Sequence, residues 1–219
     1  MLLAGHFVAV PEPIEGPGLP RAERQATASD CLTDRLPHDG CWFDTAQEAL
    51  AACLPLRVPA AARLYALLVP ADHAGDFVGD ILAAGTDEPV LLANLDGRAG
   101  APAREAAEGG HELGWEVLGY DHGLLHSWLC NDLYEDALRE LRVETGERGL
   151  LPDRETAVRV AAWANARSDT KPVTWFPAAL VEWDTPVPGR TGPATTEAPA
   201  PPAAQPWWRR IPRRARPEP

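Results

Sequence analysis

The stretch "LGWEVLGYDHGLLHSWLCND", residues 113–132, joins an alternating apolar segment to a cluster of chemically versatile side chains. Its first part, 113–121, alternates in the way that is typical of a β-strand. From about 126 to 142 apolar residues recur at helical spacing, which predicts a long helix. Two histidines, a serine, a cysteine and two aspartates fall within 121–132, so this junction is the first candidate for a functional site.

The segments on either side predict a mixture of strands and helices. Further strands are expected where apolar runs lie between turn residues, at 2–10, 63–69, 90–95 and 173–183. Further helices are expected at 44–54, 72–85 and 153–167, with Asp44 and Asp153 as N-caps, Gln47 completing a capping box, and Gly85 as the C-terminal stop.

This order predicts a single α+β domain of about five strands and four helices, with a mixed α/β arrangement as the alternative. The domain is expected over 1–184, with a loop or insertion at 96–110. That loop leaves open two subdomains that share one sheet.

Charge is unevenly distributed along the chain. Residues 1–184 hold 14 basic and 30 acidic side chains, a net charge of −16, while residues 185–219 hold 6 arginines and 2 glutamates, a net charge of +4. The two values add to the total of −12. An acidic body repels phosphates, so it disfavours nucleic acid and favours a basic protein as partner.

Residues 185–219 form a proline-rich tail with 10 prolines in 35 residues. Because the tail lacks apolar periodicity, we expect it to be disordered with polyproline character. Its end combines aromatic and basic side chains that would give weak contact with an anionic membrane. Nucleic-acid contact, folding back onto the acidic body and a simply solvated end are the alternatives. The residues concerned are Trp207, Trp208, Arg209, Arg210, Arg213 and Arg214.

Cellular location and cysteine chemistry are linked. No apolar run reaches the roughly 20 residues that span a bilayer. The amino terminus carries no Lys or Arg before its short apolar run, so it is expected to be a strand and not a signal peptide, which favours the cytoplasm. Cys31, Cys41, Cys53 and Cys130 contain no C-x-x-C pair, so free thiols are expected in that reducing compartment.

A helical projection from residue 126, at about 100° per residue, divides the cluster into two faces. His126 and Cys130 fall on the apolar face. We therefore expect Cys130 to be an unreactive core residue and His126 to bond a backbone carbonyl or a neighbouring side chain. Two other interpretations remain open: zinc ligation by His122, His126 and Cys130 with Asp121 as fourth ligand, or a His126–Cys130 thiolate nucleophile.

The opposite face of the same projection carries Trp128 among acidic residues. Trp128 is either covered by another element of the fold or exposed as an interface anchor. In the second case it would form, with Asp132, Glu135 and Asp136, a surface for a basic partner.

The runs "LGWEVLGYDHGLLHSWLCNDL", "ERGLLPD" and "KPVTWFPAALVEW" contain a G-[YW]-E-[IV]-L-G-x-D strand followed by H-S-[FW]. This pattern resembles a group of small, largely uncharacterised bacterial proteins that look like immunity-type partners of secreted toxins. The resemblance covers about residues 111–184. It implies an acidic α+β protein that occupies the active site of a basic toxin and sequesters it.

The preferred hypothesis is therefore a cytoplasmic, immunity-like protein-binding module. The chain lacks a Walker loop, G-x-G-x-x-G and G-x-S-x-G, and the balance favours a protein that is not an enzyme and needs no cofactor. A small thiol- or zinc-dependent enzyme using His126 and Cys130 is the first alternative. A membrane-peripheral adaptor that acts through the Trp/Arg tail is the second.

Overall fold

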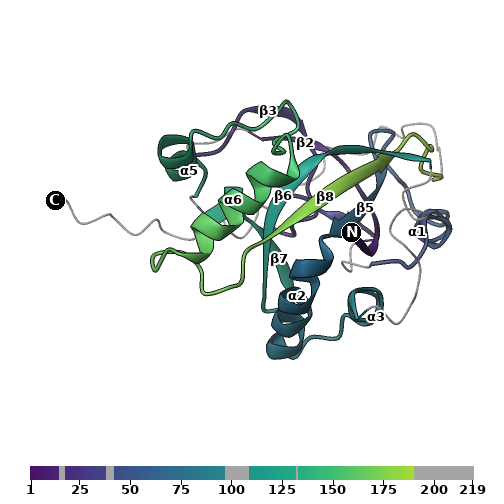
Figure 1. Cartoon of the computed structure of the whole chain (residues 1–219). Helices are drawn as coiled ribbons and strands as arrows, with labels where there is room; N and C mark the ends of the chain where they lie inside the picture. The colour runs from purple at the N-terminus through teal and green to yellow at the C-terminus, as the bar shows by residue number, and fades with distance from the viewer. Residues whose placement is uncertain (15–17, 38–41, 97–108, 132, 190–219) are drawn as a thin grey trace.

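A six-stranded antiparallel sheet forms the centre of the protein in the computed structural model, which describes residues 1–14, 18–37, 42–96, 109–131 and 133–189 (Figure 1). The strand order is β4-β1-β5-β8-β6-β7. These strands are β1 (Leu2–Ala9), β4 (Arg35–Leu36), β5 (Arg63–Val69), β6 (Gly110–Asp121), β7 (Leu124–Ser127) and β8 (Phe176–Trp183). Two short strands, β2 (Glu12–Ile14) and β3 (Ala22–Gln25), pair separately.

Helices cover both faces of this sheet. They are α1 (Ala46–Cys53), α2 (Ala71–Ala84), α3 (Pro89–Leu95), α5 (Tyr134–Leu141) and α6 (Arg154–Asn165), with a 3-10 turn, η1 (Trp128–Asn131), directly after β7. Buried residues of α1, α5 and α6 belong to one core cluster and those of α2 and α3 to another. Alternate residues of β5 and β8 contribute to the two clusters, which places them on opposite faces of the sheet.

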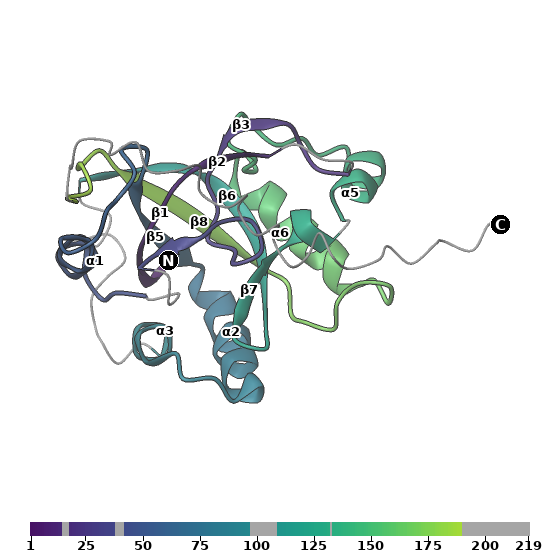
Figure 2. The same cartoon turned by 180° about the vertical axis from the view of Figure 1, so that it is seen from behind.

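The N-terminal segment also covers part of the sheet. Seen from behind, the chain that carries β2 and β3 crosses β6 (Figure 2). Beyond β3 the same segment reaches β7, where the amide of Asp30 donates to the carbonyl of Leu125 over 2.8 Å. The segment at Asp30 therefore lies against the edge strand β7, whereas Arg35 and Leu36 form β4 and pair with β1.

The predicted fold class is confirmed as α+β. The described ranges contain eight strands and five α-helices, more than the expected five and four, because several short strands were not predicted and the segment 90–95 is a helix. The strands expected at 2–10, 63–69, 113–121 and 173–183 are present, as are the helices at 44–54, 72–85 and 153–167. Within the described ranges, no helix is both long and apolar enough to cross a membrane.

Helix ends follow the predicted signals at two positions of three. Asp153 caps α6 by accepting from the amide of Thr156 over 2.7 Å, and Gly85 ends α2 in a left-handed conformation. At α1 the N-cap is Thr45, which forms the capping box with Glu48, so the expected pair of Asp44 and Gln47 was one residue out of register.

Two predicted elements were wrong. Residues 90–95, expected as a strand, belong to helix α3, which begins with Pro89 and buries Leu91 and Leu95 one turn apart. The long helix expected at 126–142 is instead strand β7, the turn η1 and the short helix α5. The cause is the turn at His122 and Gly123: both have positive φ, at 51° and 82°, which matches a two-residue hairpin and returns the chain along β6.

The loop or insertion expected at 96–110 begins after α3 and ends at β6. Residues 97–108 lie outside the described residues, as does the tail from 190 to 219.

Two glycine positions give opposite expectations for stability. Gly114 lies at a bulge of β6 with φ +147°, and a Cβ there would be 2.8 Å from the carbonyl oxygen of Leu151. Gly114→Ala is therefore expected to lower the free energy of unfolding by about 1–3 kcal/mol. Gly79 lies inside α2 with open space around it, so Gly79→Ala is expected to raise it by roughly 0.5–1 kcal/mol. Urea unfolding of the two variants would contradict this assignment if both changes had the same sign.

Candidate functional site

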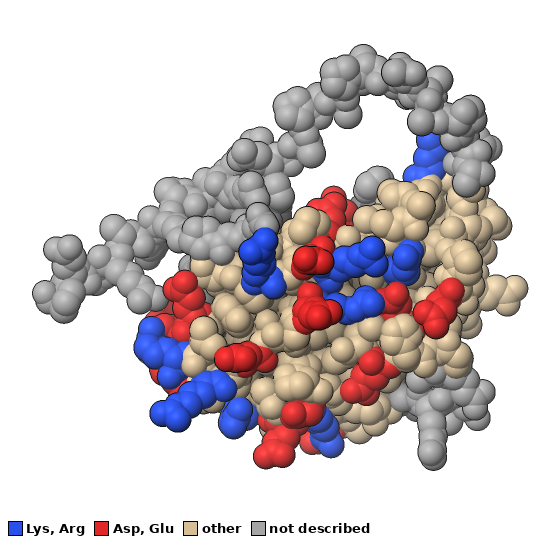
Figure 3. Space-filling view, turned by 90° about the horizontal axis from the view of Figure 1, so that it is seen from above, with Lys and Arg blue, Asp and Glu red and all other residues tan. Residues whose placement is uncertain are grey.

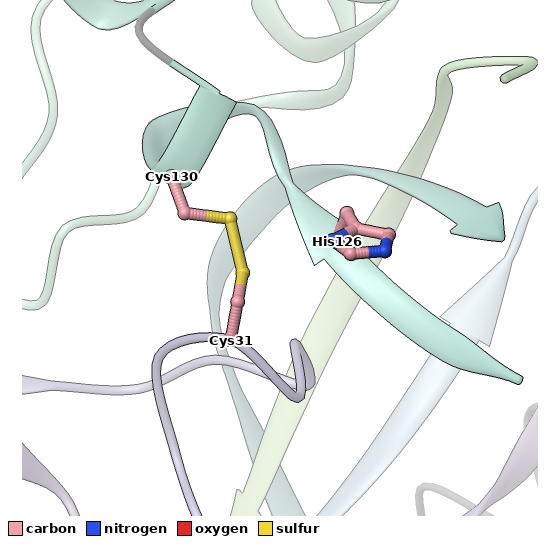
Figure 4. Close-up of side chains that lie close together, drawn as sticks. All are labelled: Cys31, His126 and Cys130. Atoms are coloured by element: carbon pink, nitrogen blue, oxygen red, sulfur yellow. A yellow bond between two sulfur atoms is a disulfide. The ribbon is translucent and has the colours of Figure 1, made fainter. Parts of the chain in front are cut away.

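A disulfide between Cys31 and Cys130 joins the N-terminal segment to η1 (Figure 4). The two residues are 99 positions apart in the sequence, and their Cα atoms are separated by 6.8 Å. The expectation of free thiols was therefore wrong for this pair. Cys53 is a free, buried thiol, and Cys41 lies outside the described residues.

Each half of this disulfide is positioned by hydrogen bonds to β7. On one side, a carboxylate oxygen of Asp30 accepts from the amide of Leu125 over 2.7 Å, next to Cys31. On the other, the side chain of Asn131 donates to the carbonyl of Ser127 over 2.8 Å. That bond closes the tight turn from β7 into η1 and places Cys130 above the end of the strand.

His126 lies in β7 opposite Gly119 and is buried. Its Nε2 atom is 2.7 Å from Nζ of Lys171, the only lysine of the chain, and that Nζ is also 3.1 Å from a carboxylate oxygen of Asp121. Because an ammonium group can only donate, Nε2 accepts, and the proton of the neutral ring is on Nδ1. Burial, reinforced by the charge of Lys171, lowers the pKa of His126 and favours this neutral form.

The three residues Cys31, His126 and Cys130 come together in one cluster. The two sulfur atoms and one ring nitrogen of His126 all lie within 4.8 Å of one another. Cys31 and His126 are buried, whereas Cys130 is partly exposed at the surface. Two thiols and an imidazole are a donor set for thiol chemistry or for binding a thiophilic metal ion.

This arrangement corrects the predicted zinc set. His122 lies in the hairpin turn, its side chain is 89% exposed, and its closest charged neighbour is Asp121 at 3.5 Å. Asp121 is engaged by Lys171 and is not part of the cluster. Of the predicted ligands only His126 and Cys130 come together, and the third member, Cys31, was missed. Nothing local in the sequence marks Cys31, because its partners are about a hundred residues away.

The predicted binding face does not form as expected. Trp128 is completely buried and packs edge-on against Tyr134, so the covering alternative is confirmed and Trp128 is no exposed anchor. Asp136 is buried and paired with Arg139 and Arg167. Glu135 is exposed, as expected. The projection from residue 126 assumed one continuous α-helix. The physical reason for the difference is that η1, a 3-10 turn, separates residues 128–131 from helix α5, so the angles of the projection do not apply across it.

Asp132 and the tail residues Trp207, Trp208, Arg209, Arg210, Arg213 and Arg214 lie outside the described residues.

Beneath the Cys31 segment lies a buried carboxyl group that the sequence did not suggest as special. Glu116, on β6, accepts from the hydroxyl of Thr27 over 2.6 Å and from the amide of Ala28 over 3.2 Å. Burial raises its pKa to about 7, although bonds from Thr27, Ser127 and Ala28 oppose the rise. The segment leading to Cys31 is therefore anchored on a carboxyl group that titrates near neutral pH.

Opposite charges mix on the protein surface. On the face shown in Figure 3, basic and acidic side chains lie among one another and form no single-sign patch. Some charged side chains form ion pairs, such as that between Arg148 and the buried Glu182 at 2.6 Å.

Comparison with known proteins finds no matching family model, no similar curated protein and no similar solved structure. The geometry of the cluster is therefore the basis for assigning a function. Its distinguishing feature is the meeting of Cys31 with His126 and Cys130.

The buried carboxyl group predicts a pH dependence of stability. The pKa of Glu116 is raised from 4.5 to about 7 in the folded protein. Between these pH values the carboxyl group is protonated in the folded protein and ionised in the unfolded chain, so unfolding releases a proton. Its protonated form stabilises the fold fully below about pH 4.5, and this contribution is lost towards pH 7. Glu116→Gln, which keeps an acceptor for Thr27, is expected to gain stability relative to wild type between those values, by an amount on the order of 3 kcal/mol.

Urea unfolding of both proteins at about pH 5 and pH 8 measures this difference. Glu135→Gln, at an exposed position of α5, is the matched control and should leave the pH dependence unchanged. An equal pH dependence for wild type and Glu116→Gln would contradict the assignment.

Proposed function

We propose that the chain is a thiol–disulfide redox protein whose reactive centre is Cys31, Cys130 and His126. The observation that carries this proposal is the meeting of both sulfur atoms with a ring nitrogen inside 4.8 Å, from segments about a hundred residues apart. This is the thiol-dependent alternative of the sequence analysis, with Cys31 added as the second sulfur.

The chemistry of such a centre is disulfide exchange. A thiolate of an external dithiol attacks Cys130, the partly exposed sulfur, and forms a mixed disulfide while Cys31 leaves as a thiolate. The second thiol of the reductant then attacks the mixed disulfide and releases Cys130. Two electrons and two protons pass to the protein, and the dithiol becomes a disulfide.

Positive charge next to the centre favours the thiolate form. Lys171 donates to His126 and so holds its ammonium group beside the cluster. A neighbouring cation lowers the pKa of a cysteine thiol. A carboxylate oxygen of Asp121, 3.1 Å from Nζ, helps to keep Lys171 in this place.

The state of the disulfide depends on the compartment. In a cytoplasm kept reducing, the dithiol form would prevail until an oxidant forms the bond. The non-covalent bonds of Asp30 to Leu125 hold the segment of Cys31 against β7 in both states, so the two sulfur atoms would stay close enough to re-form the bond.

This proposal predicts two additional reactive thiols after mild reduction of the folded protein. The oxidised protein should show neither Cys31 nor Cys130 to a thiol reagent, and a dithiol added without denaturant should expose both. Mass spectrometry of the alkylated peptides identifies them. If the pair is reduced only after unfolding, the disulfide is a static cross-link and the proposal fails.

Lys171→Met tests whether the ammonium group of Lys171 favours the thiolate form of the cysteines. Loss of the cation is expected to raise the thiol pKa of reduced Cys130, which would move the pH profile of its alkylation rate to higher pH. Arg139→Met, which removes an exposed cation of α5, is the matched control and should leave the profile in place.

A second candidate is the immunity-like interaction protein of the sequence analysis. Its support is the net charge of −16 over residues 1–184, obtained from 14 basic and 30 acidic side chains. A strongly acidic body attracts a basic partner and accelerates its association. The partner class is therefore a basic protein, and Glu135 on α5 is the one member of the predicted binding set that is exposed in the described residues.

Charge reversal tests this second candidate. A basic partner retained by the full chain at low salt should be released by raised salt and should bind Glu135→Lys more weakly. Glu12→Lys, at an exposed position of β2, makes the same charge change elsewhere and should bind like wild type. Equal weakening by both variants would indicate non-specific attraction and would count against a defined interface.

A further inference from the structure

We propose that the reduced protein binds one Zn²⁺ through Sγ of Cys31, Sγ of Cys130 and one ring nitrogen of His126. This inference rests on the reversible disulfide proposed above, because the sulfur atoms become ligands only after that bond opens. Zinc and the disulfide then exclude each other, since both use the same pair of sulfur atoms.

The distances suit a tetrahedral site. With zinc–sulfur bonds of about 2.3 Å and zinc–nitrogen bonds of about 2.0 Å, ligand atoms lie roughly 3.5–3.8 Å from one another. The three candidate atoms are already inside 4.8 Å. Opening the disulfide lets the sulfur atoms separate to the required spacing by rotation of two short side chains, without displacing β7 or the segment at Cys31.

The donor set selects the metal. Thiolate and imidazole ligands favour Zn²⁺ over Mg²⁺ and Ca²⁺, which take oxygen ligands. Burial of Cys31 and His126 shields the site, whereas the partly exposed Cys130 gives access to it. Among the described residues the cluster supplies three ligands, so water takes the fourth position. Three protein ligands with one open position is the arrangement of catalytic zinc sites.

Lys171 competes with the metal for His126. Its ammonium group uses the lone pair of Nε2, and the opposite ring nitrogen carries the proton, so neither nitrogen can bind a metal while this bond is present. Zinc binding therefore requires Lys171 to release the ring and stay with Asp121, its other partner at 3.1 Å. A cation beside Zn²⁺ adds repulsion. Removing Lys171 should therefore strengthen zinc binding, whereas damage to the fold would weaken it.

The balance of the reaction is complete with a dithiol reductant. The dithiol passes two electrons and two protons to the Cys31–Cys130 disulfide and becomes a disulfide itself. Zn²⁺ then displaces the two thiol protons, which are released to solvent. Oxidation of the zinc-bound thiolates by a disulfide oxidant reverses both steps and releases the ion.

The experiment titrates the full chain with Zn²⁺ against a chromophoric chelator, in the oxidised form and after reduction with a phosphine that does not bind zinc. The reduced wild type should bind one equivalent and the oxidised form none. Cys31→Ser and His126→Ala should each weaken binding at least about 10-fold. Cys53→Ala, which removes the free buried thiol that is not part of the cluster, should bind like wild type. Lys171→Met should bind more tightly than wild type.

Thiol counting on the same samples separates the two proposals. If the reduced, folded protein shows Cys31 and Cys130 as free thiols but binds no zinc, or if Cys31→Ser binds as well as wild type, the zinc site is refuted while the redox centre stands. If the two thiols never appear in the folded protein, the redox centre is refuted, and the zinc site falls with it. At a pH at which the thiols are ionised in both proteins, weaker binding by Lys171→Met would also overturn the proposed ligand role of His126, and that variant keeps all three ligands.

Discussion

The pairing of β8 with both β5 and β6 is the interaction on which the rest of the structure depends. The last strand of the described residues lies between a strand from the first half of the chain and a strand from the second, and it pairs antiparallel with each. All eight of its residues are buried. Because its two faces contribute to two separate cores, β8 packs against α6 on one side and against α2 on the other. On the α2 side, the rings of Phe176 and Phe77 stack with their centroids 4.4 Å apart.

The candidate site occupies the edge of this sheet. β6 continues beyond β8 into the hairpin turn at His122 and Gly123, and β7 returns along it. That return sets His126 opposite Gly119, where the missing side chain leaves room for Val173. The same return brings η1, with Cys130, next to the N-terminal segment. An edge strand has unpaired backbone groups, and the segment at Asp30 covers those of Leu125.

Local signals in the sequence predicted most of the sheet and little of the site. "RLYALLV" at 63–69 and the cap at Asp153 depend on neighbours within a few residues, and both were predicted correctly. The run at 90–95 was too short for its period to separate strand from helix, although Pro89 is a typical first residue of a helix. The His122–Gly123 turn also had a local signal, a glycine between two apolar runs. Because this turn was not predicted, the helical projection did not describe the directions of the side chains from His126 to Asp136. The contact of Cys31 with Cys130 had none, because it depends on tertiary packing across 99 residues.

The segment that carries Cys31 is held by more than its disulfide. Thr27 and Ala28 donate to Glu116, Asp30 bonds the backbone of Leu125, and Arg35 pairs with Asp30 while its guanidinium lies 4.5 Å from the ring of Trp42. A cross-link that joins two otherwise loose segments serves mainly to restrict the unfolded chain. Here the Cys31 segment has these non-covalent contacts as well, so we expect Cys31 to stay near His126 and Cys130 when the disulfide opens. Persistence of the cluster in the reduced state is what both disulfide exchange and metal binding require.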